Sequence, residues 1–186
     1  MPRQVEPMTS LEHALRVFAG QYPQQAAWAG EYLALLQAGG ENPFYRSRLA
    51  GHFTASCWLV SADGRRVLLT HHRKLQRWLQ LGGHADGEHD LAAAALREAE
   101  EESGLSGLVV EARIFDIDKH QIPAQGKVPG YWHYDVRYVV RAEASEDFVI
   151  SEESLALAWR DIAALAEDDG CDASLARMAR RWLQRV

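Results

Sequence analysis

The stretch of this chain that most limits its fold is QLGGHADGEHDLAAAALREAEEESGL, residues 80–105. Two glycines precede a short polar loop, and Asp90 then stands where it can cap a helix. Side chains three and four positions apart are neighbours on a helix, so Glu98, Glu101 and Glu102 share one side. Each like-charged i,i+4 pair destabilises a helix by about 0.2–0.5 kcal/mol in water. We infer that something bound there compensates for the repulsion.

The ligand chemistry of this helix favours a hard divalent cation. Carboxylate oxygens suit Mg²⁺ or Mn²⁺, which keep several waters and bridge a few carboxylates to substrate phosphates. The alanines at 92–95 are small enough to let the opposite side of the helix pack closely against a sheet. A solvated acidic run at a helix end is the alternative interpretation of residues 100–102 taken alone.

Length and composition favour one globular domain with a core of its own, since 47% of the 186 residues are hydrophobic. The net charge of -6 argues against binding a nucleic acid polymer, whose phosphates require a basic protein surface. No stretch approaches the roughly 18 apolar residues of a membrane span, and the first residues lack the pattern of a secretion signal. Cys57 and Cys171 match no disulfide framework or paired zinc-ligand spacing. These features predict a cytoplasmic protein that binds no membrane.

The beginning of the chain is predicted to be helical. Thr9 and Glu12 have the spacing of a capping box, and residues 24–38 form a second helical segment that ends before two glycines. We therefore divide the chain into a helical N-terminal extension, residues 1–45, and a main domain, residues 46–186. Two roles for the extension stay open: it forms the interface of a homodimer, or it closes over a cleft as a lid.

Beyond the extension, the pattern changes to that of strands. β-branched and aromatic residues flank Asp63-Gly64, a dipeptide that suits a hairpin turn. Further strands are predicted at residues 77–83, 108–120 and 131–144, and a strand and two helices follow them. The order of strands and helices predicts an α/β fold with a mixed sheet and helices on its faces.

Residues 97–105, REAEEESGL, resemble the core of the Nudix box, G-x5-E-x7-R-E-U-x-E-E-x-G-U, in which U is apolar. The matching positions are Arg97, Glu98, Ala99, Glu101, Glu102, Gly104 and Leu105, and Gly83 stands at the first glycine. The pattern's first glutamate falls on His89, whereas this chain has Glu88 one residue earlier. Glu88 is the candidate for that role.

The resemblance implies the Nudix α/β/α sandwich, with the box as a loop-helix-loop. It also implies an enzyme that hydrolyses a nucleoside diphosphate linked to another moiety, with Mg²⁺ or Mn²⁺ as cofactor and a small-molecule pyrophosphate substrate as partner. Carried over by residue, the metal ligands are Glu98, Glu101, Glu102 and the carbonyl of Gly82 or Gly83. Box residue Arg97 is expected to orient the glutamates through salt bridges.

The general base varies among such enzymes, so the three box glutamates are all candidates. The acidic pair Glu152 and Glu153 lies in a region that often supplies a further carboxylate in similar proteins, and Glu153 is a candidate metal ligand. A solvated turn or helix cap is the alternative for this pair.

Several residues outside the helix are candidates for substrate binding. Strand alternation places His133, Asp135 and Arg137 on one face, where a polar surface of mixed charge suits a cleft and Arg137 binds a phosphate or carboxylate. An edge strand with a wet face is the alternative. His84 follows the two glycines and is expected near the metal, and Trp78 is a candidate for stacking on a base.

Two other functions remain open. An isomerase of the type I isopentenyl diphosphate kind shares the fold and has a similar Gly-His loop, but that family lacks the full R-E-U-x-E-E run. A catalytically silent nucleotide-sensing module is the other, and the intact glutamates argue against it. The box residues recognise the pyrophosphate and do not specify what is attached to it.

Overall fold

The structure is a computed structural model that describes residues 11–152 and 154–185. Its strands are β1 His52–Val60, β2 Arg66–His72, β3 Arg77–His84, β4 Leu108–Ile122, β5 Tyr131–Ala142 and β6 Ser154–Asp161. Its helices are α1 Leu11–Gln21, α2 Ala26–Gln37, α3 Leu91–Ser103, α4 Ile162–Glu167 and α5 Ala173–Leu183, with a 3-10 turn, η1, at Pro23–Gln25. Among the described residues, no helix combines the length and the apolar character needed to span a membrane.

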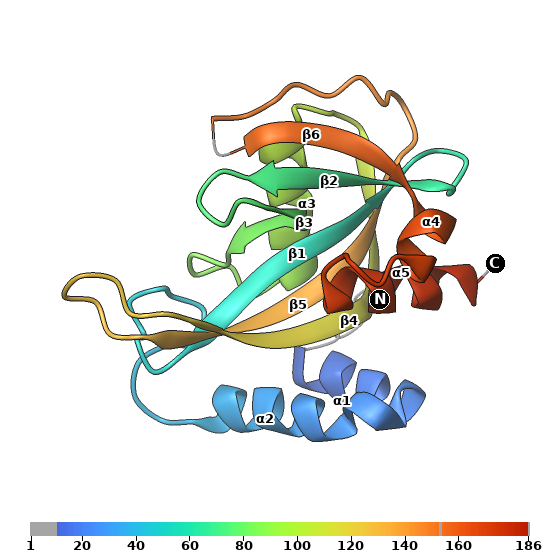
Figure 1. Cartoon of the computed structure of the whole chain (residues 1–186). Coiled ribbons are helices and arrows are strands. Elements are labelled where there is room, and N and C mark those ends of the chain that lie inside the picture. The colour runs from blue at the N-terminus through green and yellow to red at the C-terminus, as the bar shows by residue number, and fades with distance from the viewer. Residues whose placement is uncertain (1–10, 153, 186) are drawn as a thin grey trace, which may run out of the picture.

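The described strands form one six-stranded sheet in the order β4-β5-β1-β3-β2-β6. Strands β1 and β5 are parallel and the other pairs are antiparallel, so the sheet is mixed. Figure 1 shows α3 behind the sheet, α4 and α5 in front of it, and α1 and α2 along the β4 side. The predicted α/β/α sandwich with a helical N-terminal extension is confirmed.

Helix α3 begins and ends where its caps predict. The Asp90 side chain accepts hydrogen bonds from the amides of Ala92 and Ala93, both at 3.1 Å. Gly104 ends the helix in the left-handed conformation with φ +68°, which an L side chain rarely adopts. Small buried side chains on one side of α3, among them Ala95 and Ala99, pack in the core. The helix therefore lies close to the sheet.

The N-terminal helices share the core of the main domain. Leu15 and Phe18 of α1 and Tyr32 of α2 are fully or almost fully buried. The Tyr32 hydroxyl donates to the backbone carbonyl of Asp135 at 3.0 Å. The predicted helices are confirmed, Thr9 of the predicted capping box lies outside the described residues, and the division at residue 45 stays a prediction.

A buried ion network joins β4 and β5 to α5. Asp116 is 0% exposed, and its carboxylate accepts from Arg177 at 2.6 Å and from Arg181 at 2.7 Å. Arg137 of β5 lies 3.4 Å from Asp116 and donates to Asp135 at 2.8 Å. A buried charge is stable only when its partners are complete, so this network fixes how α5 lies on the sheet.

Replacing Asp116 tests how much this network contributes to the stability of the fold. We expect Asp116→Asn to lower the free energy of unfolding by about 3–5 kcal/mol, because it leaves buried guanidinium groups without their countercharge. The matched control is Glu111→Gln, since Glu111 pairs with Arg141 and Arg185 at partly exposed positions, where the expected cost is about 0–1 kcal/mol. Denaturant unfolding followed by tryptophan fluorescence measures both. Equal costs for the two variants would contradict the assignment.

Candidate active site

Two glutamates of α3 meet a glycine pair at the end of β3. Glu102 is only 8% exposed, and its Oε1 accepts a hydrogen bond from the amide of Gly82 at 2.7 Å. The Glu98 carboxylate lies against Gly83, where an added Cβ would come within 3.0 Å of its atoms. The sequence QLGGH therefore brings backbone and two carboxylates together: Gly83 leaves room for Glu98, Gly82 lies close to β1, and the Gly82 amide binds Glu102.

Arg97 ties the helix to the end of β3. Its guanidinium donates to the backbone carbonyl of His84 and to Glu98 Oε1, both at 3.0 Å. It lies 4.0 Å from Glu101, whose side chain is 64% exposed. Arg97 therefore lies beside Glu98 and Glu101, with Glu98 and Glu102 turned toward the sheet and Glu101 toward solvent.

The loop between β3 and α3 is held by the segment that follows α2. The Gly87 amide donates to the backbone carbonyl of Phe44 at 2.9 Å, and the Phe44 ring stacks on His89 with ring centroids 4.1 Å apart. Arg46 donates to Asp86 at 2.8 Å. The N-terminal extension and its connection to β1 therefore help to position the loop that leads into the glutamate helix.

Two other predicted carboxylates lie elsewhere. Glu88 is exposed, and its carboxylate accepts from the amide of Asp90 at 2.8 Å, within the turn that begins α3. Its role as the first glutamate of the box stays a prediction. Glu153 lies outside the described residues, and its neighbour Glu152 is exposed.

Three histidines gather on the sheet face opposite α3. His52, His84 and His133 come from β1, β3 and β5, and their nearest ring nitrogens all lie within 4.8 Å of one another. His52 was not predicted from the sequence. The signal that finds it is strand register, because His52 pairs with His133 and Thr54 pairs with His84.

Burial keeps these imidazoles neutral near pH 7. It lowers the pKa of His84 to about 4, with a further contribution from the positive charge of Arg46. It also lowers the pKa of His133 to about 3, with smaller contributions from His120, His84 and His52. These rings are therefore hydrogen-bonding groups or metal ligands rather than cations that attract phosphate.

Every second residue of β3 points away from α3. Trp78, Gln80, Gly82 and His84 share this face of the sheet. Trp78 borders a hollow of about 430 Å³ together with Arg77 and other residues of β2, β6 and the α4–α5 region. In the described part of the chain, the buried Oε1 of Gln80 has no hydrogen-bond partner.

Asp135 and Arg137 do not line an open cleft. Strand β5 lies between β4 and β1, so the alternative interpretation, an edge strand with a wet face, is also wrong. Arg137 is 2% exposed and fully engaged in the buried network, and the Asp135 carboxylate accepts from Thr54 and Ser56, both at 2.9 Å. Arginines of α5 cover this face, and we leave Asp135 and Arg137 out of the candidate site.

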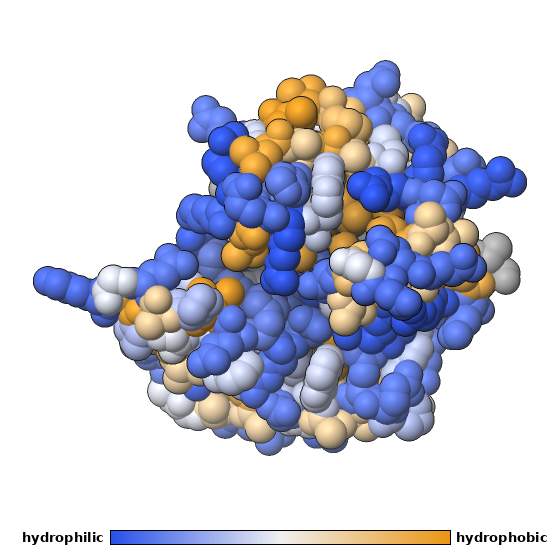
Figure 2. Space-filling view, in the orientation of Figure 1, coloured by the Kyte–Doolittle hydropathy of each residue, from blue (hydrophilic) through white to orange (hydrophobic). Residues whose placement is uncertain are grey.

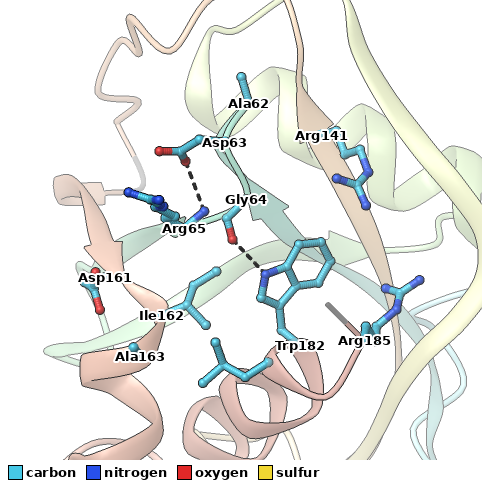
Figure 3. Close-up of a pocket in the computed structure, with 11 residues that line it drawn as sticks. Ala62, Asp63, Gly64, Arg65, Arg141, Asp161, Ile162, Ala163, Trp182 and Arg185 are labelled. Carbon is cyan, nitrogen blue, oxygen red and sulfur yellow. Dashed lines mark hydrogen bonds between the residues drawn. The ribbon is translucent and has the colours of Figure 1, made fainter.

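A larger hollow of about 790 Å³ lies far from the glycine pair. It adjoins the β1–β2 turn, and Figure 3 shows Trp182 in its wall, with the indole donating to the carbonyl of Gly64 at 2.8 Å. Arg65, Arg141 and Arg185 also line it. None of the box glutamates is among its lining residues.

A family model for the NUDIX domain matches residues 51–181. The chain belongs to the Nudix family. The match covers the whole sheet and leaves α1 and α2 outside it. Membership in this family supports the prediction that the chain is a hydrolase acting on pyrophosphate bonds.

Solved structures with this fold come from several organisms. An Ap4A hydrolase from C. elegans, in a binary complex, has a TM-score of 0.56 and 18% identity over 72% of this chain and 96% of that chain. A MutT protein from Methanosarcina mazei Go1 has a TM-score of 0.57 and 14% identity over 74% and 96%. A Nudix family hydrolase from Clostridium perfringens has a TM-score of 0.52 and 26% identity over 73% and 97%. A search of the curated proteins finds no match.

The two glycines are expected to respond differently to an added methyl group. In Gly83→Ala the new Cβ meets the flexible end of Glu98, so we expect pyrophosphate hydrolysis to fall at least tenfold while the melting temperature changes little. In Gly82→Ala the Cβ meets the backbone of Ala55 and Ser56, so we expect a large loss of stability. Gly39→Ala is the control because a Cβ there meets nothing within 4 Å. Normal hydrolysis by a folded Gly83→Ala variant would contradict the placement of Glu98.

The buried histidines predict a pH dependence of stability. The unfolded chain holds histidines with a pKa near 6.5, whereas burial lowers the pKa of His84 to about 4 and of His133 to about 3. Below pH about 6.5 the unfolded state therefore binds more protons, and the free energy of unfolding should fall as the pH drops from about 6.5 to 4. Denaturant unfolding in the presence of a chelator measures this slope. A slope in His133→Phe equal to that of the wild type would contradict the prediction.

Proposed function

We propose that this chain is a metal-dependent pyrophosphohydrolase that cleaves a nucleoside diphosphate linked to another moiety. The observation that carries the proposal is the convergence of Glu98 and Glu102 on Gly82 and Gly83. Nudix hydrolases generally use divalent metal ions. The neighbouring carboxylates are a costly arrangement without a cation.

The residues around the glycine pair fit a hard divalent ion. The carboxylates of Glu98 and Glu102 lie at the glycine pair, and the space beside Gly83 is one that a Cβ would fill. We propose Glu101 and the backbone carbonyl of Gly83 as the further oxygen ligands. We propose that these groups hold Mg²⁺ or Mn²⁺. When bound, such an ion neutralises charge on the phosphates and makes water more acidic.

The chain's own residues have separate tasks in this proposal. Glu98 and Glu102 are held toward the sheet, the first by Arg97 and the second by the amide of Gly82. Glu101 is the most exposed of the three box glutamates that match the pattern, which favours it as the base that accepts a proton from the attacking water. Arg97 positions this set because it also holds the carbonyl of His84.

We propose that the part of the substrate beyond the pyrophosphate binds near Trp78 of β3. Figure 2 shows that hydrophilic residues cover most of the face that carries α4 and α5, with apolar residues gathered over its upper part. We propose that the base of a small-molecule substrate packs on Trp78, beside the hollow of about 430 Å³ that Trp78 borders. Arg160 borders the same hollow as Trp78 and provides a positive charge.

A panel of nucleoside diphosphate derivatives, incubated with and without Mg²⁺ or Mn²⁺, tests the reaction. Chromatography of the phosphorylated products identifies the bond that is broken. Metal-dependent cleavage of one class supports the proposal. Binding without cleavage would favour a silent sensing module, and turnover of an isopentenyl-type diphosphate with its diphosphate retained would favour an isomerase.

Neutralising single glutamates tests the roles within α3. We expect Glu98→Gln and Glu102→Gln each to lower kcat by at least a hundredfold while the fold persists, because like-charge repulsion is removed along with a metal ligand. Glu100→Gln is the matched control, since Glu100 is exposed on the same helix and carries the same charge change. Steady-state kinetics at saturating Mg²⁺ measures all three. Near-normal turnover in Glu98→Gln or Glu102→Gln would refute the assignment.

A further inference from the structure

We propose that His52, His84 and His133 form a second metal site, for a divalent transition metal such as Zn²⁺, on the sheet face opposite α3. The three residues lie near one end of the neighbouring strands β5, β1 and β3 (Figure 1). Their nearest ring nitrogens are within 4.8 Å of one another. This site uses nitrogen ligands and is separate from the carboxylate site on α3.

The surroundings of His52 fix which of its nitrogens carries a lone pair. Its Nδ1 lies 3.2 Å from the backbone carbonyl of Arg48, and because a carbonyl only accepts, Nδ1 must donate. The lone pair is then on Nε2. His52 is 1% exposed, and within the described part of the chain its buried Nε2 has no hydrogen-bond partner. A metal-binding histidine typically has this arrangement, with the second nitrogen donating to a backbone carbonyl.

The other two histidines complete a three-nitrogen set. The buried Nε2 of His133 likewise has no partner among the described residues. His84 and His133 are half-buried, which leaves a route by which a cation can enter. Zinc binds imidazole nitrogen at about 2.0–2.1 Å, so tetrahedral ligands lie about 3.3 Å apart. Binding would require the nitrogens to approach one another by up to about 1.5 Å from the 4.8 Å within which they now lie.

Aromatic packing alone does not account for the cluster. The ring of His52 contacts those of His84, His133 and Tyr131, with centroids 5.0–5.3 Å apart. Phenylalanine or tyrosine rings would pack in the same way without burying two nitrogens that lack partners. Neutral imidazoles are ligands for Zn²⁺, Co²⁺ and Ni²⁺ and poor ligands for Mg²⁺.

The site leaves one coordination position open. Three protein ligands on a tetrahedral ion leave the fourth position to water or to an anionic ligand. His84 directly follows Gly83, and Arg97 holds its carbonyl beside the box glutamates. A transition metal held here would therefore lie next to the candidate active site, on the other face of the same strand.

Metal titrations on the full chain test this inference. The background is the Glu98→Gln, Glu101→Gln, Glu102→Gln variant, treated with a chelator, so that the box carboxylates do not contribute. We expect it to bind one equivalent of Zn²⁺ in competition with a chromophoric chelator. With Co²⁺ we expect the intense visible bands of a four-coordinate ion, and excess Mg²⁺ should compete with neither.

Single replacements of the ligands provide the decisive comparison. In the same background, His52→Phe, His84→Phe and His133→Phe keep a ring for packing, and each should weaken Zn²⁺ binding at least tenfold and abolish the Co²⁺ bands. His120→Phe is the matched control, because the ring of His120 lies 5.3 Å from that of His133 but is outside the three-nitrogen set. Circular dichroism identifies the variants that fold. Absence of binding in the folded background protein, or unchanged binding in any folded ligand variant, would overturn the proposal, whatever the substrate of the enzyme is.

Discussion

The structure around the candidate active site depends on the close contact between the glutamate side of α3 and the glycine pair of β3. The contact is possible because Gly83 has no side chain and because α3 buries small residues such as Ala95 and Ala99. It places Glu98 and Glu102 near each other and partly out of water, where like charges are least stable. Arg97 offsets some of this repulsion. A bound cation would offset the rest.

Other parts of the chain maintain this contact from outside. The segment after α2 holds the loop that leads into α3, through the carbonyl of Phe44 and the ion pair of Arg46 with Asp86. On the opposite face, the buried network around Asp116 fixes α5 over β4 and β5. The loop into α3 is thus held on one face of the sheet, and α5 is held on the other face. Because alternate residues of a strand point to opposite faces, β3 presents Gly83 to the carboxylates and His84 to the imidazole cluster.

Local signals in the sequence were enough to predict the elements and the box. The Asp90 cap, the Gly104 stop and the Asp63-Gly64 hairpin depend on neighbouring residues, and the structure has all three. The burial of Arg137 in an ion network could not be predicted from neighbouring residues. Strand alternation shows which residues share a face, but the arginines of α5 that cover this face lie far along the chain. His52 was missed for the same reason, because its partners His84 and His133 are brought to it only by strand register.

The central claim is that Glu98 and Glu102 together hold a divalent cation at the glycine pair. The most direct test is a crystal structure of the protein soaked in Mn²⁺, with the ion located by its anomalous scattering. The account predicts a strong peak within bonding distance of carboxylate oxygens of both residues and beside the Gly83 carbonyl. A peak confined to exposed glutamates such as Glu100, or no peak near α3 in a crystal that retains Mn²⁺, would contradict it.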